Sequence, residues 1–161
     1  MKIVVLGVGN ILLSDEGIGV RAVEEIERRY RFPEHVELID GGTSGMEVMG
    51  SLAHADQVLI LDAVKSGKPP ATLVKLVGAE VPKFFSLKMS PHQITLADVL
   101  ATLEFAGEAP ANVTVLGIEP VSLEYDITLT PAVAERLPQL VEMAIAELRG
   151  WGVPVEEIQG N

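Results

Sequence analysis

The sequence predicts an α/β fold: a doubly wound, mostly parallel five-stranded sheet with one antiparallel edge strand and helices on both faces. Three observations lead to this prediction. Short, almost wholly apolar runs recur along the chain, as is typical of strands buried on both faces of a parallel sheet. Segments with helical spacing of apolar residues separate these runs. One further strand-like run follows its predecessor too closely for a crossover helix, so we expect it to be antiparallel and at an edge.

The first half of the chain contains three units in which a strand leads to an acidic residue. We expect the strands at residues 3–7, 36–40 and 57–62, followed by Asp15-Glu16, Asp40 and Asp62 respectively. A helix is predicted from Ile18 to Tyr30, with Ser14 or Asp15 as its N-cap. A short helix is predicted over 46–52, after the glycine-rich turn at 41–45.

The second half is predicted to complete the sheet and to add two helices. Its expected elements are the edge strand at 71–77, an irregular segment at 78–89, a helix that begins at Ser90-Pro91, a strand at 113–118 and a loop at 119–129. We expect Phe84-Phe85 to pack in the core. The last helix is predicted to begin at Thr130-Pro131, to kink or restart at Pro138 and to stop at Gly150. We therefore expect one domain over 1–150 and a loose tail over 151–161.

The composition restricts the possible partners. The 161 residues carry a formal charge of -11, which argues against nucleic acid and anionic membranes, because both bind basic surfaces. The chain contains no cysteine, which excludes disulfides and thiolate metal sites. No segment approaches the roughly 20 apolar residues of a membrane span. The sequence thus suggests a cytoplasmic protein that binds small molecules, cations or other proteins.

Two familiar kinds of site fit the motifs poorly. Gly7-Val8-Gly9 follows a strand, as in dinucleotide-binding folds, and Asp40 could serve as the ribose-binding acid. However, Leu12 stands where the third glycine belongs, and Asp15-Glu16 would repel a pyrophosphate. A serine nucleophile at Ser44, with His92 and Asp62, is also disfavoured because position 46 is methionine rather than the glycine of a nucleophile elbow.

A metal site fits the polar residues better. Glu16 and Asp62 follow strands that should be neighbours, and His92 precedes a helix whose start should return to the same edge of the sheet. Two carboxylates and one imidazole suit a borderline divalent ion such as zinc or nickel, with positions left open for water or substrate. In this interpretation the acids that disfavour a phosphate favour a cation.

Four segments together resemble the hydrogenase maturation proteases, the endopeptidases that trim the C-terminus of the [NiFe]-hydrogenase large subunit. These segments are residues 7–19, Asp40-Gly41-Gly42-Thr43-Ser44-Gly45, Asp62-Ala63 and Ser90-Pro91-His92-Gln93. The match runs in register over about residues 1–150, without a departure in the motifs. The final dozen residues carry no signature.

The resemblance implies that Glu16, Asp62 and His92 contact a metal, and that Asp40 takes part in substrate recognition and cleavage. It implies that the metal is nickel already inserted into the large-subunit precursor, although zinc or cadmium can occupy such a site. The enzyme would remove a short C-terminal extension, and the resemblance favours a monomer.

The residues themselves leave the chemistry open. A metal can polarise the scissile carbonyl or activate water, or a carboxylate can act as the general base, so the protease could be metal-dependent or of aspartic type. The rival hypothesis is a nucleotide-binding or metal-sensing module without hydrolytic activity.

Overall fold

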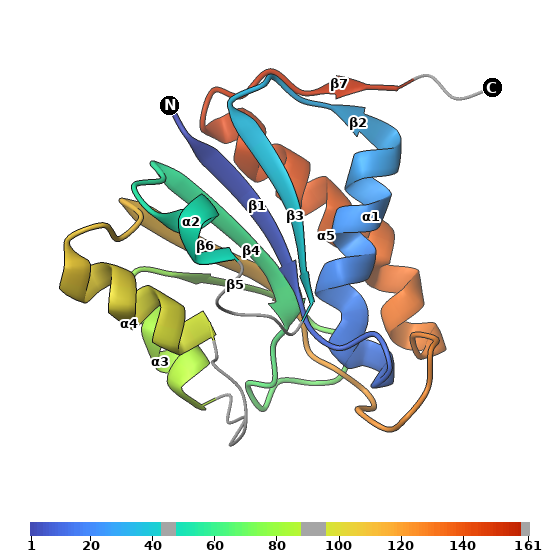
Figure 1. Ribbon diagram of the computed structural model, residues 1–161. Helices are drawn as coiled ribbons and strands as arrows, with labels where there is room; N and C mark the ends of the chain where they lie inside the picture. Colours follow the sequence, from blue (N-terminus) through green and yellow to red (C-terminus); the bar gives the residue numbers. More distant parts are fainter. Residues whose placement is uncertain (43–47, 88–95, 159–161) are drawn as a thin grey trace.

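The main sheet is built around β1, which lies between two parallel neighbours. The computed structural model describes residues 1–42, 48–87 and 96–158 (Figure 1). The five strands lie in the order β3 (Val36–Gly42), β1 (Ile3–Val8), β4 (Gln57–Ala63), β6 (Asn112–Ile118) and β5 (Leu73–Val77). All neighbouring pairs are parallel except β5 and β6, which are antiparallel at the edge. The predicted fold class and edge strand are therefore confirmed.

Helices cover both faces of this sheet (Figure 1). One face carries α1 (Ile18–Arg29) and α5 (Pro131–Gly150), and the other carries α2 (Met49–Leu52), α3 (Glu80–Leu87) and α4 (Leu96–Ala106). Alternate residues of β1 enter the two cores: Val5 packs with α1 and α5, and Leu6 packs on the opposite face. Both are fully buried. This explains why the strand reads as an unbroken apolar run.

The segment that we expected to be irregular at 78–89 contains α3. Val81 and Phe85 lie four residues apart, so both project from one side of this helix into the core. Phe84 is partly buried against the same core, and its ring contacts Phe85 edge to face with centroids 4.9 Å apart. The expected core packing of the two aromatic residues is therefore confirmed. The predicted helix start at Ser90-Pro91 lies outside the described residues.

The final helix runs unbroken through Pro138. Pro131 occupies its first turn and Gly150 its last position, as predicted. The alternative of a restart at Pro138 is wrong, because one helix spans 131–150, and the alternative of a kink stays a prediction. Pro138 leaves the carbonyl of Ala134 without its usual helical partner. Both residues are exposed, so water can satisfy that carbonyl.

Residues 151–158, which we expected to form a loose tail, pack against the domain instead. Val153 is buried in the core beneath α1 and α5. β7 (Glu156–Glu157) pairs antiparallel with β2 (Tyr30–Arg31), and Arg29 lies 3.4 Å from the Glu157 carboxylate. A two-residue strand carries too little pattern to be predicted from sequence. Within the described part of the chain, no helix is both long enough and apolar enough to cross a bilayer.

Candidate functional site

Two of the predicted acids lie at the carboxyl-terminal edge of the sheet, on either side of β1. Gly7 of β1 is aligned with Asp40 of β3 and with Leu61 of β4. Asp62 is the next residue of β4. Two strand spacings separate β3 from β4, so the Cα atoms of Asp40 and Asp62 lie about 10 Å apart. This edge is where open α/β sheets bind their ligands.

Asp62 is a fully buried carboxylate at the end of a central strand. Its Oδ1 accepts a hydrogen bond of 2.8 Å from the backbone N–H of Ala63. β6 lies unusually close at this level, because a Cβ on its Gly117 would come within 2.2 Å of the Asp62 carbonyl oxygen. A buried carboxylate is costly unless hydrogen-bond donors or cations compensate it. Asp62 is therefore an acid that requires polar or metal partners in this place.

Glu16 approaches the same strand on a short turn. It belongs to η1 (Ser14–Gly17), a single 3-10 turn that contacts β4, and its side chain is half-buried. Gly9 has a positive φ of 124°, and a Cβ there would lie 1.8 Å from the Glu16 carbonyl oxygen. The glycine thus lets the loop fold back on itself under Glu16. Its role is packing, not the cradling of a pyrophosphate.

Asp15 does not face a metal with Glu16, nor does it cap α1. It is fully buried, and the N-cap position of α1 is Gly17, without a side-chain hydrogen bond. Asp15 Oδ2 accepts from the backbone N–H groups of Val121 (2.9 Å) and Ser122 (3.1 Å). Thr130 donates its backbone N–H to Oδ1 (2.8 Å), and its hydroxyl lies within 3.1 Å of both carboxylate oxygens. The predicted capping role is wrong because distant backbone donors surround this carboxylate.

A second set of hydrogen bonds joins the same two loops. Ser14, whose φ is 51°, donates its backbone N–H to Asp126 (2.8 Å) and its hydroxyl to the carbonyl oxygen of Thr128 (2.9 Å). Thr128 in turn donates its hydroxyl (2.7 Å) and its backbone N–H (2.8 Å) to Asp126 Oδ1. These two bonds, the hydroxyl first, hold the pKa of Asp126 below its usual range. The loop over 119–130 is therefore tied to the turn that carries Glu16.

The remaining predicted site residues are not brought into this group by the described structure. Asp40 is exposed on β3, and side-chain alternation places it on the α1 face of the sheet, whereas Asp62 shares the opposite face with Ile60. His92 and Ser44 lie outside the described residues. Within 1–42, 48–87 and 96–158, no three acidic or histidine side chains are grouped closely enough to hold a metal ion.

Glu119 is a third buried acid near this edge, after Asp15 and Asp62, and sequence reasoning missed it. It follows β6, is 5% exposed, and accepts hydrogen bonds from the backbone N–H and hydroxyl of Ser66 (both 2.9 Å) and from Gly67 (3.2 Å). It thereby fixes the loop that follows Asp62. Four strands of the sheet thus lead to acids, which was a signal in the sequence, but acids were singled out after only three of these strands.

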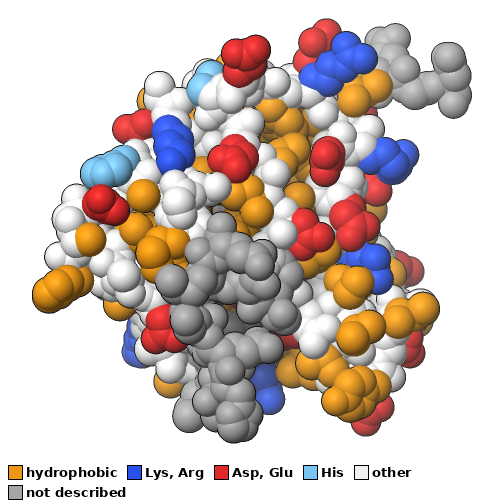
Figure 2. All heavy atoms as spheres, viewed as in Figure 1, with side chains coloured by type: hydrophobic (Ala, Val, Ile, Leu, Met, Phe, Trp, Pro, Cys, Tyr) orange, Lys and Arg blue, Asp and Glu red, His pale blue; other side chains and the backbone are white. Residues whose placement is uncertain are grey.

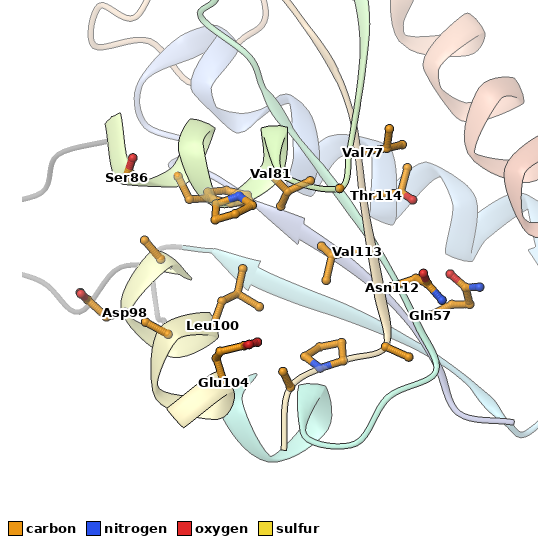
Figure 3. A pocket seen from close by; sticks show the side chains of 18 of the residues that line it. Gln57, Val77, Val81, Ser86, Asp98, Leu100, Glu104, Asn112, Val113 and Thr114 are labelled. Atoms are coloured by element: carbon orange, nitrogen blue, oxygen red, sulfur yellow. The ribbon is translucent and has the colours of Figure 1, made fainter. Parts of the chain in front are cut away.

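A groove of about 1170 Å³ lies elsewhere on the molecule, between α3 and α4 (Figure 3). Val81 and Leu100 line it from the two helices, and Val113 of β6 forms part of its floor. Its far end reaches Gln57 at the start of β4. Gln57 is five residues from Asp62, or about 16 Å along the strand. The groove is therefore distinct from the acidic edge.

Comparison with known proteins shows the family of this chain. The family model for hydrogenase maturation proteases matches residues 20–147. The hydrogenase 2 maturation protease of Escherichia coli is 51% identical over 95% of this chain and 94% of its own, and the HupD hydrogenase expression/formation protein of Rhodobacter capsulatus is 42% identical over 96% and 74%.

Solved structures extend the likeness to the whole fold. The hydrogenase maturating endopeptidase HybD of E. coli superposes with a TM-score of 0.92 at 49% identity, covering 98% of both chains. The [NiFe] hydrogenase maturation protease HybD of Thermococcus kodakarensis shares the fold alone, with a TM-score of 0.71 at 22% identity over 91% of this chain and 99% of that one. This chain therefore belongs to the hydrogenase maturation protease family and is a peptidase.

Proposed function

We propose that this enzyme removes the C-terminal extension of a nickel-loaded [NiFe]-hydrogenase large-subunit precursor, and that Glu16, Asp62 and His92 contact the nickel carried by that precursor. The nickel is then part of the substrate. Asp40, exposed at the same edge of the sheet, is proposed to take part in substrate recognition and cleavage.

The observation that carries this proposal is the pairing of a buried carboxylate with an adjacent acidic turn. Asp62 is fully buried at the end of β4, and η1, which carries Glu16, contacts that strand. Carboxylate and imidazole ligands bind borderline ions more weakly than thiolates do. Such a donor set suits an enzyme that must test for nickel in its substrate and then release the product.

Two chemistries are compatible with these residues. A carboxylate, Asp62 or Glu16, can take the proton of the attacking water while the nickel only fixes the position of the substrate. Alternatively, the nickel of the precursor supplies Lewis-acid activation, and the carboxylates hold it in place. A precursor carrying zinc in place of nickel separates the two, because only the second chemistry makes the cleavage rate follow the Lewis acidity of the ion.

The deciding experiment compares nickel-free and nickel-containing precursor. Each form is incubated with the enzyme, and the mass of the large subunit is followed over time. We expect the nickel-containing form to lose its C-terminal extension and the nickel-free form to keep it. Equal cleavage of the two forms would contradict the recognition of nickel, and no cleavage of either would contradict the proposed function. The cytoplasmic location suggested by the sequence and the monomeric state favoured by the resemblance stay predictions.

A further inference from the structure

Exposed hydrophobic side chains gather beside the turn that carries Glu16. Of ten large hydrophobic residues that are exposed in the described part of the chain, six fall within residues 11–12 and 121–127. We call these six the rim patch; they are Ile11, Leu12, Val121, Leu123, Tyr125 and Ile127. Figure 2 shows hydrophobic side chains gathered at the lower right, over the loops drawn below α1 and α5 in Figure 1.

The two segments form one continuous surface. The backbone N–H of Asp126 donates to the carbonyl oxygen of Leu12 (3.0 Å), and the N–H of Asp15 donates to the carbonyl oxygen of Ser122 (3.2 Å). An isolated bridge also pairs Leu13 with Asp126. The exposed residues of both segments are therefore held next to one another by backbone hydrogen bonds.

Polar contacts hold this surface in place although it is formed by loops. The buried carboxylate of Asp15 collects donors from both ends of the loop, at Val121, Ser122 and Thr130. A loop that exposes Tyr125 to 90% and Ile127 to 68% gains little from hydrophobic burial of its own. Its order comes from polar contacts beneath it. A preformed apolar surface is suited to binding, because the entropy of ordering the loop has already been lost.

The position and charge of the rim patch indicate its partner. Leu12 lies four residues before Glu16 in the same loop, so a protein that presents its C-terminus to Glu16 and Asp62 must also meet this surface. Glu124 and Asp126 are exposed within the patch, Arg21 reaches its margin by donating to the carbonyl oxygen of Ile127 (3.0 Å), and the whole chain carries a charge of -11. The complementary surface is therefore apolar with lysine or arginine at its margin.

We infer that the rim patch is the docking surface for the folded body of the hydrogenase large-subunit precursor, with the C-terminal extension passing from it to the acidic edge. This inference rests on the proposed function. It assigns binding of the precursor to residues that do not touch the cleaved bond. Their loss should therefore weaken capture of the substrate without slowing the chemical step.

The test is the double variant Tyr125→Ser/Ile127→Ser, with Phe105→Ser as the matched control. Phe105 is 96% exposed on α4, which lies on the other side of the molecule in Figure 1. Initial rates of precursor processing are measured against precursor concentration. Central apolar anchors dominate interface energies, so we expect the KM of the double variant to rise at least about 10-fold with an unchanged kcat. Phe105→Ser should match the wild type.

The outcomes separate this inference from the proposed function. Failure of the wild type to process nickel-containing precursor rejects the function itself. Processing by the wild type together with an unchanged KM in the double variant rejects the docking surface alone, as does an equal rise of KM in Phe105→Ser. Analytical ultracentrifugation completes the test: a wild-type dimer that the double variant dissociates would make the patch a contact between copies of this chain and would also overturn the inference. Thermal unfolding confirms that all variants are folded.

Discussion

Replacing Asp15 by asparagine tests whether one buried carboxylate holds the edge of the site together. Asp15 accepts three backbone N–H groups and one hydroxyl. Asparagine keeps one acceptor oxygen and places an NH₂ group where the other stood. In the better of its two orientations this NH₂ faces the N–H of Thr130, and that donor loses its partner. The other orientation leaves Val121 and Ser122 without an acceptor.

The magnitude follows from these contacts. A hydrogen bond to a charged group contributes about 1.5–3 kcal/mol, and a buried donor without a partner costs about 1–3 kcal/mol more. We therefore expect Asp15→Asn to lower the free energy of unfolding by about 3–5 kcal/mol. With a urea m-value of about 2 kcal/mol/M, the midpoint falls by about 2 M. That loss is a large part of the free energy of unfolding of a typical domain, which is roughly 5–15 kcal/mol.

Urea unfolding followed by circular dichroism measures the loss, and Asp56→Asn is the matched control. The Asp56 carboxylate accepts one hydrogen bond, from the N–H of Lys2 at the opposite end of the sheet, in an exposed place. Its variant should lose no more than about 1 kcal/mol. The reasoning would be refuted by two results together: a fall in the free energy of unfolding for Asp15→Asn as small as that for Asp56→Asn, and hydrogen exchange at the Val121 and Ser122 amides as slow as in the wild type. The loop would then be held by contacts other than those of this carboxylate.

Three further predictions concern the same edge of the sheet. We expect precursor processing, measured by mass, to be lost without loss of the folded circular dichroism spectrum in each of Glu16→Gln, Asp62→Asn and His92→Ala. A Cβ on Gly19 would lie 2.0 Å from the carbonyl oxygen of Leu61, so Gly19→Ala should lower the urea-unfolding free energy by about 1–3 kcal/mol, whereas Gly50→Ala, with open space around it, should be neutral or slightly stabilising. Because its pKa is lowered, Asp126 should keep its bonds to Thr128 at neutral pH and lose them only as the pH falls below the ordinary range near 4, which an NMR titration of the Thr128 amide detects.

Periodicity was enough to predict the sheet but not the elements with mixed patterns. β1 and β4 read as unbroken apolar runs because both of their faces are buried, and β5 could be placed at an edge from the shortness of its connection. α3 was missed although Val81, Phe84 and Phe85 have helical spacing, because the helix has only eight residues and contains Pro82 near its start, which disfavours a helix in a sequence pattern. β7 was missed because it has two residues and both are exposed.

For the acids, strand order could be predicted from neighbouring residues, whereas hydrogen-bond partners far away in the sequence could not. That Asp40 and Asp62 reach one edge of the sheet follows from strand order, because parallel strands deliver their carboxyl ends together. The partners of Asp15 lie 106 to 115 residues further along the chain, in a loop without periodicity. From the sequence, Glu16 was assigned to the metal site and Asp15 was offered as an N-cap, and the partners of Asp15 could not be foreseen. Only the tertiary structure separates the acid that is satisfied by backbone donors from the acid that adjoins β4.

Hydrogen-bond partners far away in the sequence also explain how an acidic edge can be ordered. Asp15 and Glu119 each follow a strand, and the buried carboxylate of each accepts hydrogen bonds from the backbone N–H groups of a loop. Asp15 binds the loop over 121–130, and Glu119 binds Ser66 and Gly67. Backbone donors carry no net charge, so dipoles and not salt bridges compensate the two acids: among the described residues, neither carboxylate forms an ion pair with a lysine or arginine. A cationic side chain there would compete with the nickel of the precursor for Glu16 and Asp62. Compensation by backbone dipoles instead orders the loops of this edge and leaves Glu16 and Asp62 for a cation that arrives with the substrate.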